Sequence, residues 1–236
     1  SGNTILTTGD GIESFAQSPS VTVEGNTITG PSDRTGHGVG LSPQGGGAVI
    51  ASNTISGFST GVDVSAAGTT VSDNSLSGNV TGIRARGGPT VSRNRVDGGE
   101  IGEFGIDADG ATSTIEENSV VSTSSAAIAV RGADGTVENN LIGRRVIDGA
   151  VVGNDGDGIV VFAGPTSVKG NDLAGTGGDA IKVGPSVIAT LESNEIADTA
   201  GTPISVAGTA APEAPVVAAA IQTTTGESVR TTLLIS

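Results

Sequence analysis

The sequence predicts an all-β fold, a single-stranded right-handed parallel β-helix of about nine coils, and three observations lead to this prediction. A unit of the form hydrophobic-x-x-Asn-x-hydrophobic recurs at intervals of about 24 residues. A second unit, a small residue followed by Ile or Val, recurs in phase with it. The core has to consist of Val, Ile, Leu and Ala, because the chain has four Phe and no Tyr, Trp, Met or Cys.

The Asn unit sets the period of the repeat. Its first copy is reduced to Asn3-Thr4-Ile5, and each later copy has one Asn between two aliphatic residues. The Asn residues are Asn3, Asn26, Asn53, Asn74, Asn94, Asn118, Asn140, Asn171 and Asn194. Because Asn tolerates left-handed backbone, we expect it at a sharp corner of each coil. Stacked amides can also hydrogen-bond to one another as a ladder.

The second unit predicts a short strand with one buried face. Typical copies are Gly82-Ile83-Arg84-Ala85 and Gly105-Ile106-Asp107-Ala108, in which apolar residues alternate with period two. A repeat this short cannot bury its own apolar face. Stacked copies can, because each strand then pairs in parallel with its copy one repeat later.

These two units resemble the repeat of the parallel β-helix family. That fold is shared by pectate lyases, polygalacturonases, alginate-modifying enzymes, phage tailspikes and many uncharacterised surface proteins. The resemblance covers residues 1–208. It implies the fold but little about activity, because the repeated residues are core and corner positions.

The end of the chain departs from the repeat. Residues 209–215 are rich in Pro and Ala and predict a linker after the β-helix of residues 1–208. Residues 216–236 alternate around a turn at Thr225-Gly226-Glu227, which predicts a β-hairpin. This C-terminal segment is expected either to cap the last coil or to begin a further β-sandwich domain. At the other end, the chain starts within an Asn unit, which indicates a truncated N-terminus.

Composition limits the partners of the protein. The formal net charge is −14, and Lys plus Arg total 11. Nucleic acid is disfavoured, because phosphate binding needs a clustered basic surface. No apolar run approaches the length of a membrane-spanning helix. The resemblance implies an extracellular or cell-surface location, with an extracellular polysaccharide or a surface protein as partner.

Three segments lengthen the repeat at one corner and predict a binding edge. Residues 28–39, 96–106 and 142–159 lead from the Asn unit to the second unit and are longer than in the other coils. Loops on a rigid scaffold often carry function, although such corners also tolerate insertions that have none. The charged residues of this insertion edge are Asp33, Arg34, Glu100, Glu103, Arg144 and Arg145.

Beside the insertion edge, outward positions of consecutive second units carry charges of both signs. This charged strip consists of Asp63, Arg84, Arg86, Asp107, Asp109 and Arg131. One interpretation is an ion-pair ladder that fixes strand register and contributes about 0.2–1 kcal/mol per pair. The other is a catalytic cleft with Asp107, Asp109, Arg84 and Arg86 as candidates, because lyases of this fold combine acidic residues with an Arg or Lys base. The arginines favour charged carboxylates, whereas a general acid has to hold a proton.

The single histidine, His37, is the fifth catalytic candidate. Gly36-His37-Gly38 is similar to the Gly-His-Gly segment of polygalacturonases. In that family catalytic Asp motifs precede this segment, and no Asp pair precedes it here. A lone His with no Ser or Cys partner does not indicate a hydrolytic triad.

One acidic segment offers ligands for a metal. Asp155-x-Asp157 resembles part of a calcium loop, but Thr166 stands where an EF-hand needs Glu. Asp157 has counterparts at Asp10 and Asp179, just before the strand of the second unit, which indicates a turn-forming role. No cofactor is predicted, and weak Ca²⁺ binding by Asp155 and Asp157 is the alternative.

The sequence supports three hypotheses about function. The first is a non-catalytic secreted or cell-surface module, a rigid scaffold for adhesion or glycan contact. The second is a polysaccharide lyase or glycoside hydrolase acting on a neutral or acidic polysaccharide. The third, a trimeric tailspike-like depolymerase or adhesin, needs an apolar interface, for which Val160 and Phe162 offer a small surface. The aromatic residues expected near the surface, where they could stack on a sugar, are Phe58, Phe104 and Phe162.

Overall fold

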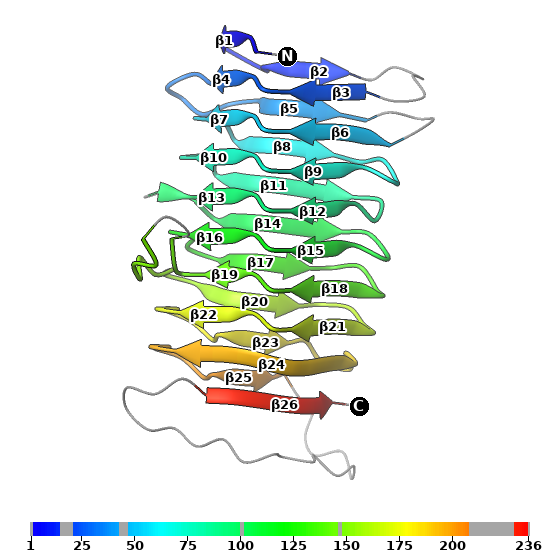
Figure 1. Ribbon diagram of the computed structural model, residues 1–236, viewed down its shortest axis with the longest axis vertical. Helices are drawn as coiled ribbons and strands as arrows, with labels where there is room; N and C mark the ends of the chain where they lie inside the picture. Colours follow the sequence, from blue (N-terminus) through cyan, green and yellow to red (C-terminus); the bar gives the residue numbers. More distant parts are fainter. Residues whose placement is uncertain are drawn as a thin grey trace.

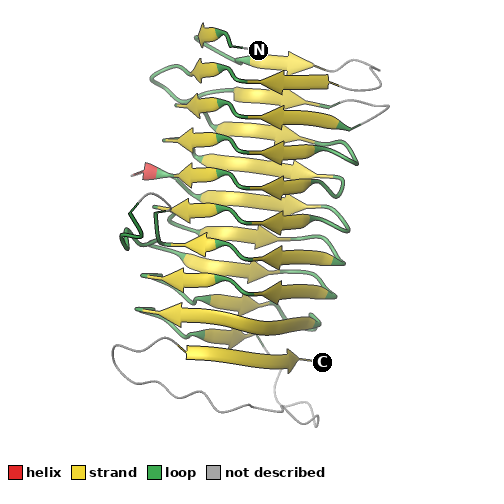
Figure 2. Ribbon diagram, in the orientation of Figure 1, coloured by secondary structure: helices red, strands yellow, loops and turns green. Residues whose placement is uncertain are grey.

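The computed structural model describes residues 2–14, 21–42, 47–99, 102–145, 148–207 and 229–235, and of the last range only the backbone. Figure 1 shows the strands stacked coil upon coil along a rod. Figure 2 shows strands joined by loops, with one short helical turn beginning at Gly99. The predicted all-β parallel solenoid is therefore confirmed.

Each coil contains three strands, which form three columns along the rod. The strands before the Asn are β3 (Val21–Glu24), β6 (Ala48–Ala51), β9 (Thr70–Ser72), β12 (Thr90–Ser92), β15 (Thr114–Glu116), β18 (Gly135–Glu138), β21 (Thr166–Lys169) and the first part of β24 (Ala189–Ala197). The strands after the Asn are β1 (Thr4–Leu6), β4 (Thr27–Thr29), β7 (Thr54–Ser56), β10 (Ser75–Ser77), β13 (Arg95–Asp97), β16 (Ser119–Val121), β19 (Leu141–Ile142), β22 (Asp172–Ala174) and the rest of β24. The strands of the second unit are β2 (Ile12–Ser14), β5 (His37–Leu41), β8 (Thr60–Val64), β11 (Thr81–Arg86), β14 (Phe104–Asp109), β17 (Ala126–Val130), β20 (Asp157–Val161), β23 (Ile181–Val183) and β25 (Ile204–Val206).

Strands of one column pair in parallel with their copies one coil away. The first two columns belong to one 17-stranded sheet, and the second-unit strands form a separate 9-stranded sheet. The register places like residues opposite each other, for example Val71 opposite Val91 and Ile83 opposite Ile106. Strands β1 and β2 make a partial first coil, so the stack amounts to about eight full turns and the predicted count of nine includes the partial one.

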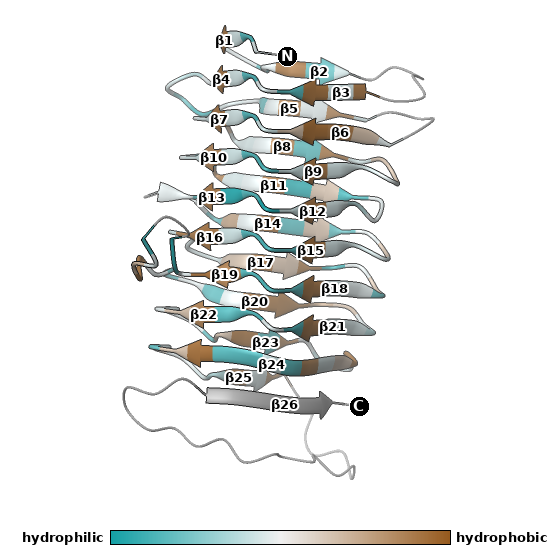
Figure 3. Cartoon of the chain, in the orientation of Figure 1, coloured by the Kyte–Doolittle hydropathy of each residue, from teal (hydrophilic) through white to brown (hydrophobic). Residues whose placement is uncertain are grey.

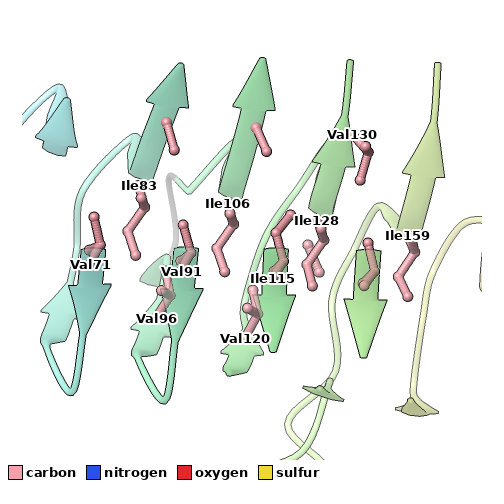
Figure 4. Close-up of a cluster of buried hydrophobic side chains, with 14 of the residues drawn as sticks. Val71, Ile83, Val91, Val96, Ile106, Ile115, Val120, Ile128, Val130 and Ile159 are labelled. Carbon is pink, nitrogen blue, oxygen red and sulfur yellow. The ribbon is translucent and has the colours of Figure 1, made fainter. Parts of the chain in front are cut away.

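The core is a set of aliphatic stacks along the rod. Ile83, Ile106, Ile128 and Ile159 follow one another in successive strands of the nine-stranded sheet, and all are fully buried (Figure 4). Figure 3 shows apolar residues on strands of all three columns. No single coil could bury these side chains alone, so the stack stabilises itself through contacts between neighbouring coils.

Phe58 also belongs to the core, so its predicted place near the surface is wrong. It is fully buried just after β7. The glycines of the preceding coil leave room for its ring, because a Cβ added at Gly30 or Gly38 would approach the ring to 2.9 or 3.2 Å.

The Asn side chains form the predicted ladder at the corner between the first two columns. The Nδ2 of each Asn donates to the Oδ1 of the Asn in the next coil, at 3.0 Å from Asn94 to Asn118 and at 3.0 Å from Asn118 to Asn140. The backbone N–H of each donates to the same oxygen, at 2.9 Å in both steps. These amides are buried, and the ladder supplies the hydrogen bonds that a buried amide needs.

The left-handed residue at this corner is the one before the Asn, so the expectation that the Asn itself adopts left-handed backbone is wrong. Ser52, Asp73 and Arg93 have φ values of 56°, 58° and 54°. The Asn side chain explains the shift, because its Nδ2 also donates to the carbonyl two residues earlier, as from Asn74 to Ser72 at 2.9 Å. That bond closes the bend, and the residue inside the bend takes the left-handed conformation.

The small residue of the second unit is required by the packing of the next coil. A Cβ added at Gly105 would lie 2.2 Å from Val120 Cγ1 and 2.5 Å from the carbonyl oxygen of Ala127. Gly38 and Gly82 are similarly crowded. Wherever another coil follows, the second unit therefore begins with Gly or Ala as the chain enters the nine-stranded sheet.

The C-terminal segment is described only in part. Strand β26 (Val229–Ile235) pairs antiparallel with β24, which differs from the parallel pairing of the coils. The predicted linker of residues 209–215 and most of the predicted hairpin of residues 216–236 lie outside the described residues. Within the part of the chain that is described, no helix is long and apolar enough to span a membrane.

Candidate functional site

The charged strip lies on the outward face of the nine-stranded sheet. Asp63 stands opposite Arg84, Arg84 opposite Asp107, and Arg86 opposite Asp109. The strand register thus places opposite charges on neighbouring coils, as predicted. Figure 3 shows hydrophilic segments on β11 and β14, whereas β17, the next strand, is more apolar.

The shortest ion pairs of the strip run diagonally. Arg86 Nη1 donates to Asp63 Oδ1 at 2.8 Å, and Arg131 Nε donates to Asp107 Oδ1 at 2.7 Å. In both pairs the arginine lies on the next coil, two residues beyond the position opposite its partner. The straight pair is longer, with Arg84 Nε 3.9 Å from Asp107 Oδ2. A long side chain reaches a diagonal neighbour easily, so strand register alone does not identify the partners.

The two acidic catalytic candidates lie in different environments. Asp107 is only 8% exposed and lies between the guanidinium groups of Arg84 and Arg131. Asp109 is exposed at the end of β14. The short, charge-assisted hydrogen bond from Arg131 fixes the position of the Asp107 carboxylate. The two aspartates therefore do not form a symmetrical pair.

His37, at the start of β5, adjoins the strip through Asp63. Its Nδ1 lies 3.9 Å from Asp63 Oδ2, is buried, and makes no hydrogen bond. Its backbone N–H donates to Asp10 Oδ1 at 2.6 Å. The structure thus brings His37, Asp63 and Arg86 together, a grouping that the sequence did not indicate because the three residues come from three coils.

Arg131 also contacts two aromatic rings. Its guanidinium carbon lies 4.6 Å from the ring centre of Phe162 and 5.5 Å from that of Phe104. Phe162 is 50% exposed, whereas Val160 is only 5% exposed and adds little to this surface. Cation–π contacts of this kind hold an arginine in place. The composition had pointed to both Phe residues, but their contact with Arg131 spans three coils.

The three insertions project from one edge of the rod. Figure 1 shows the loops between β4 and β5, β13 and β14, and β19 and β20 on the same side. Asp33 and Arg34 are exposed in the first loop, and Glu103 is exposed in the second, while Glu100 lies outside the described residues. The common edge is therefore confirmed, whereas its role in binding stays a prediction.

The third insertion is anchored to the rod by its arginine. Arg144 Nε lies 3.2 Å from Asp172 Oδ1, and its carbonyl accepts a hydrogen bond from Ser119 Oγ at 3.0 Å. The neighbouring Arg145 lies 3.8 Å from Asp148 within the loop. Arg144 is thus a structural anchor, and Arg145 is the more available of the two.

Comparison with known proteins identifies the repeat. A family model described as a right-handed beta helix region matches residues 10–161, more than half of the chain. The chain belongs to the right-handed β-helix family. No curated protein and no solved structure matches it. The match includes the charged strip and most of the Asn ladder, and it confirms the predicted handedness of the β-helix.

Three aspartates of this β-helix tie successive coils together where the chain enters the nine-stranded sheet. Each accepts a backbone N–H from the next coil, at 2.6, 2.8 and 2.8 Å. The three pairs are Asp10 with His37, Asp157 with Asp179, and Asp179 with Thr202. These bonds give the three aspartates a structural role at the turn, as the sequence indicated.

Asp179 and Asp157 each hold a second partner on the neighbouring coil. The Ser205 hydroxyl donates to Asp179 Oδ2, and this bond, followed by that from the Thr202 N–H, holds the pKa of Asp179 below its ordinary value. Asp157 Oδ2 accepts from Lys182 Nζ at 3.1 Å. Both oxygens of Asp157 are therefore engaged with the protein.

The predicted calcium ligands are not part of a larger acidic cluster. Asp155 is exposed, and Asp157 is bound as described above. Among the residues that the structure describes, no group of three or more His, Cys, Asp or Glu side chains could hold a metal ion. Calcium binding by these two residues stays a prediction.

Sequence reasoning missed two buried asparagines at the corner next to the insertion edge. Asn79 Oδ1 accepts the Phe58 N–H at 2.9 Å, and Asn154 Oδ1 accepts the Thr123 N–H and hydroxyl at 3.1 and 2.9 Å. They are 2% and 3% exposed. Unlike the ladder residues, they do not recur at a regular spacing, so the repeat gave no signal for them.

Proposed function

We propose that this β-helix is a non-catalytic module of a secreted or cell-surface protein, a rigid scaffold that presents its charged strip and insertion edge to a glycan or protein partner. The observation that carries the proposal is the pairing of the carboxylates in the strip. Asp63 is bound by Arg86, and Asp107 by Arg131. An acid–base catalyst has to reach its substrate with a free oxygen, and here an oxygen of each carboxylate is instead held by an arginine of the next coil.

The construction of the rod supports a scaffold role. The Asn ladder and the aliphatic stacks repeat through the coils, so neighbouring coils are held both at the corner and in the core. Arg131 is fixed by Asp107 and by two rings, which gives the strip a defined surface. A partner that binds a rigid surface loses less conformational freedom in the complex. The extracellular location rests on the resemblance to polysaccharide-active and surface proteins of this fold.

The alternative is a polysaccharide lyase or glycoside hydrolase. It is favoured by the contact of His37 with Asp63 beside Arg86 and by the exposed carboxylate of Asp109. In this alternative His37 or an arginine acts as the base, and the substrate lies along the nine-stranded sheet.

Turnover assays separate the two functions. The protein is incubated with acidic and neutral polysaccharides, with and without Ca²⁺, and new reducing ends and unsaturated uronate ends are measured. We expect no product above the blank for the wild type and for Asp107→Asn. Turnover by the wild type that Asp107→Asn abolishes, with circular dichroism unchanged, would establish the enzyme instead. Asp73→Asn is the matched control, because Asp73 forms an exposed ion pair on the other sheet.

A further inference from the structure

One arginine of the charged strip has a carboxylate on each neighbouring coil, but it binds only one of them. Arg86, at the end of β11, stands opposite Asp109 of the following coil, yet its side chain reaches diagonally to Asp63 of the preceding coil. Asp109 is exposed, and among the residues that the structure describes it has no ion pair or side-chain hydrogen bond. Arg86 therefore has a second acceptor on the adjacent strand, about 4.8 Å away.

The two oxygens of Asp63 are held unequally. Arg86 Nη1 donates to Asp63 Oδ1 at 2.8 Å, whereas Arg86 Nη2 lies 3.5 Å from Asp63 Oδ2. The Asp63 side chain is only 14% exposed, so water satisfies Oδ2 only in part. Oδ2 is therefore the oxygen that a further donor can take.

His37 holds a nitrogen next to that oxygen. His37 belongs to the coil before Asp63, and its Nδ1 lies 3.9 Å from Asp63 Oδ2, is buried, and makes no hydrogen bond. A neutral imidazole has one donor and one acceptor, whereas a protonated one has two donors. Protonation of His37 thus makes Nδ1 a charged donor that faces Asp63 Oδ2.

Three carboxylates surround His37 on the coils before and after it. Asp10 Oδ1 accepts the His37 N–H at 2.6 Å, and Asp63 lies on the following coil. Glu13 and His37 flank Gly40, because a Cβ added at Gly40 would lie 3.6 Å from both Glu13 Oε1 and His37 Cβ. A positive charge on His37 is therefore introduced among acidic groups.

Two arginines of β11 lie beyond Asp63, but only one of them binds it. Arg84 stands opposite Asp63, yet its Nε lies 3.9 Å from Asp107 Oδ2. Arg86 is the arginine that is hydrogen-bonded to Asp63. Once His37 is charged, Asp63 has a cation on each side, and His37 competes with Arg86 for the same carboxylate.

We propose that His37 is a proton-dependent switch that moves the guanidinium group of Arg86 from Asp63 to Asp109. Histidine ordinarily changes its charge between about pH 5 and pH 8, and His37 is the only histidine of the chain. With His37 neutral, Arg86 binds Asp63 and leaves Asp109 as an exposed anion. With His37 charged, the imidazolium takes Asp63 Oδ2 and Arg86 turns to the carboxylate opposite it. Because exposed ion pairs are weak, one added charge is enough to change the preferred partner.

The switch changes the charge that the strip presents to a partner. At neutral pH the Asp109 carboxylate is exposed at the end of β14, and in mild acid Arg86 neutralises it. The use of this change in recognition rests on the role proposed above for the charged strip. The movement of Arg86 itself does not depend on that role.

Nuclear magnetic resonance spectra of the full chain, recorded between about pH 8 and about pH 5, test the switch. The side-chain N–H signal of Arg86 should shift with the same midpoint as the ring signals of His37. His37→Gln should abolish this shift, because Gln carries no charge at any of these pH values. Asp109→Asn should remove most of it, because Arg86 then lacks the carboxylate to which it moves. The matched control is Arg93, which is bound to Asp73 at 2.9 Å on the other sheet and should give a constant signal.

Four results would overturn the proposal. These are an Arg86 signal that stays constant in the wild type, a shift that persists in His37→Gln, an undiminished shift in Asp109→Asn, and an equal shift of Arg93. The third result would show that Arg86 senses the charge of His37 without moving. Backbone amide spectra establish that each variant keeps the fold. No partner is present in these measurements, so failure of the switch and failure of glycan or protein binding are distinguishable.

Discussion

The Asn ladder and the charged strip both run from coil to coil, but they differ in how each step is made. The ladder repeats one residue, and from Asn26 to Asn171 each amide is buried and bonded to the next. The strip uses residues of opposite charge, pairs them diagonally, and gives way to Ala129 and Val160 on the following coils. An Asn side chain has both a donor and an acceptor, so the same residue can be repeated on every coil. An ion pair instead needs an acidic residue on one coil and a basic residue on the next.

This difference between the ladder and the strip indicates which of the two tolerates substitution. A ladder residue satisfies both of its neighbours, so replacing it leaves buried polar groups without partners. A strip residue faces water on one side, so its replacement is compensated in part by solvent. We therefore expect the ladder to determine stability and the strip to determine recognition.

The largest expected effect is the loss of a ladder residue from the middle of the rod. Asn118→Ala removes the acceptor of Asn94 and the donor to Asn140, which should lower the free energy of unfolding by about 2–4 kcal/mol. The control is Asn3→Ala at the end of the ladder, where the residue only donates to Asn26 and is exposed. Urea unfolding compares the two, and equal losses would contradict the ladder as the main support of the corner.

A smaller effect is expected when an arginine of the strip is replaced. Arg131→Gln breaks the 2.7 Å contact with Asp107 and the two ring contacts, which should cost about 1–2 kcal/mol. Arg93→Gln, whose ion pair with Asp73 is exposed, should cost less, and its effect should disappear at high salt. Thermal unfolding at low and high salt measures both, and a larger loss in Arg93→Gln would reverse the order proposed here.

The smallest effect is expected from the pH dependence of one inter-coil bond. The pKa of Asp179 is lowered in the folded protein, chiefly by the Ser205 hydroxyl, so its charged form contributes stability above the unfolded pKa near 4. That contribution is lost as the pH falls through the lower, folded pKa. Ser205→Ala should therefore be less stable than the wild type at pH 7, by under about 1 kcal/mol, and the gap should shrink below about pH 4. A stability difference between the wild type and Ser205→Ala that grows as the pH falls would contradict this prediction.

The fold was predictable because its signal is local and repeated. The Asn unit marks one corner of every coil, and the alternation in Gly82-Ile83-Arg84-Ala85 marks a strand. The conformation of that corner was not predictable, since the left-handed φ falls on Arg93 while Asn94 makes the bonds that close the bend. The conformational preference of Asn indicates that a corner lies nearby. The hydrogen bonds of its side chain decide which residue at that corner adopts a positive φ.

The candidate site was predictable only to the level of a surface. The sequence placed Asp107, Asp109, Arg84 and Arg86 on one outward face, which the strand register bears out. It could not assign partners, because a long arginine side chain reaches across the diagonal as well as straight across.

The ladder also gives the rod a direction. Every side-chain amide from Asn26 to Asn171 donates toward the next coil in the sequence and accepts from the coil before. Such a row of aligned dipoles is polar, and each bond polarises its neighbours. Because every bond of the row points the same way, a further coil would continue the ladder in one orientation only, head to tail.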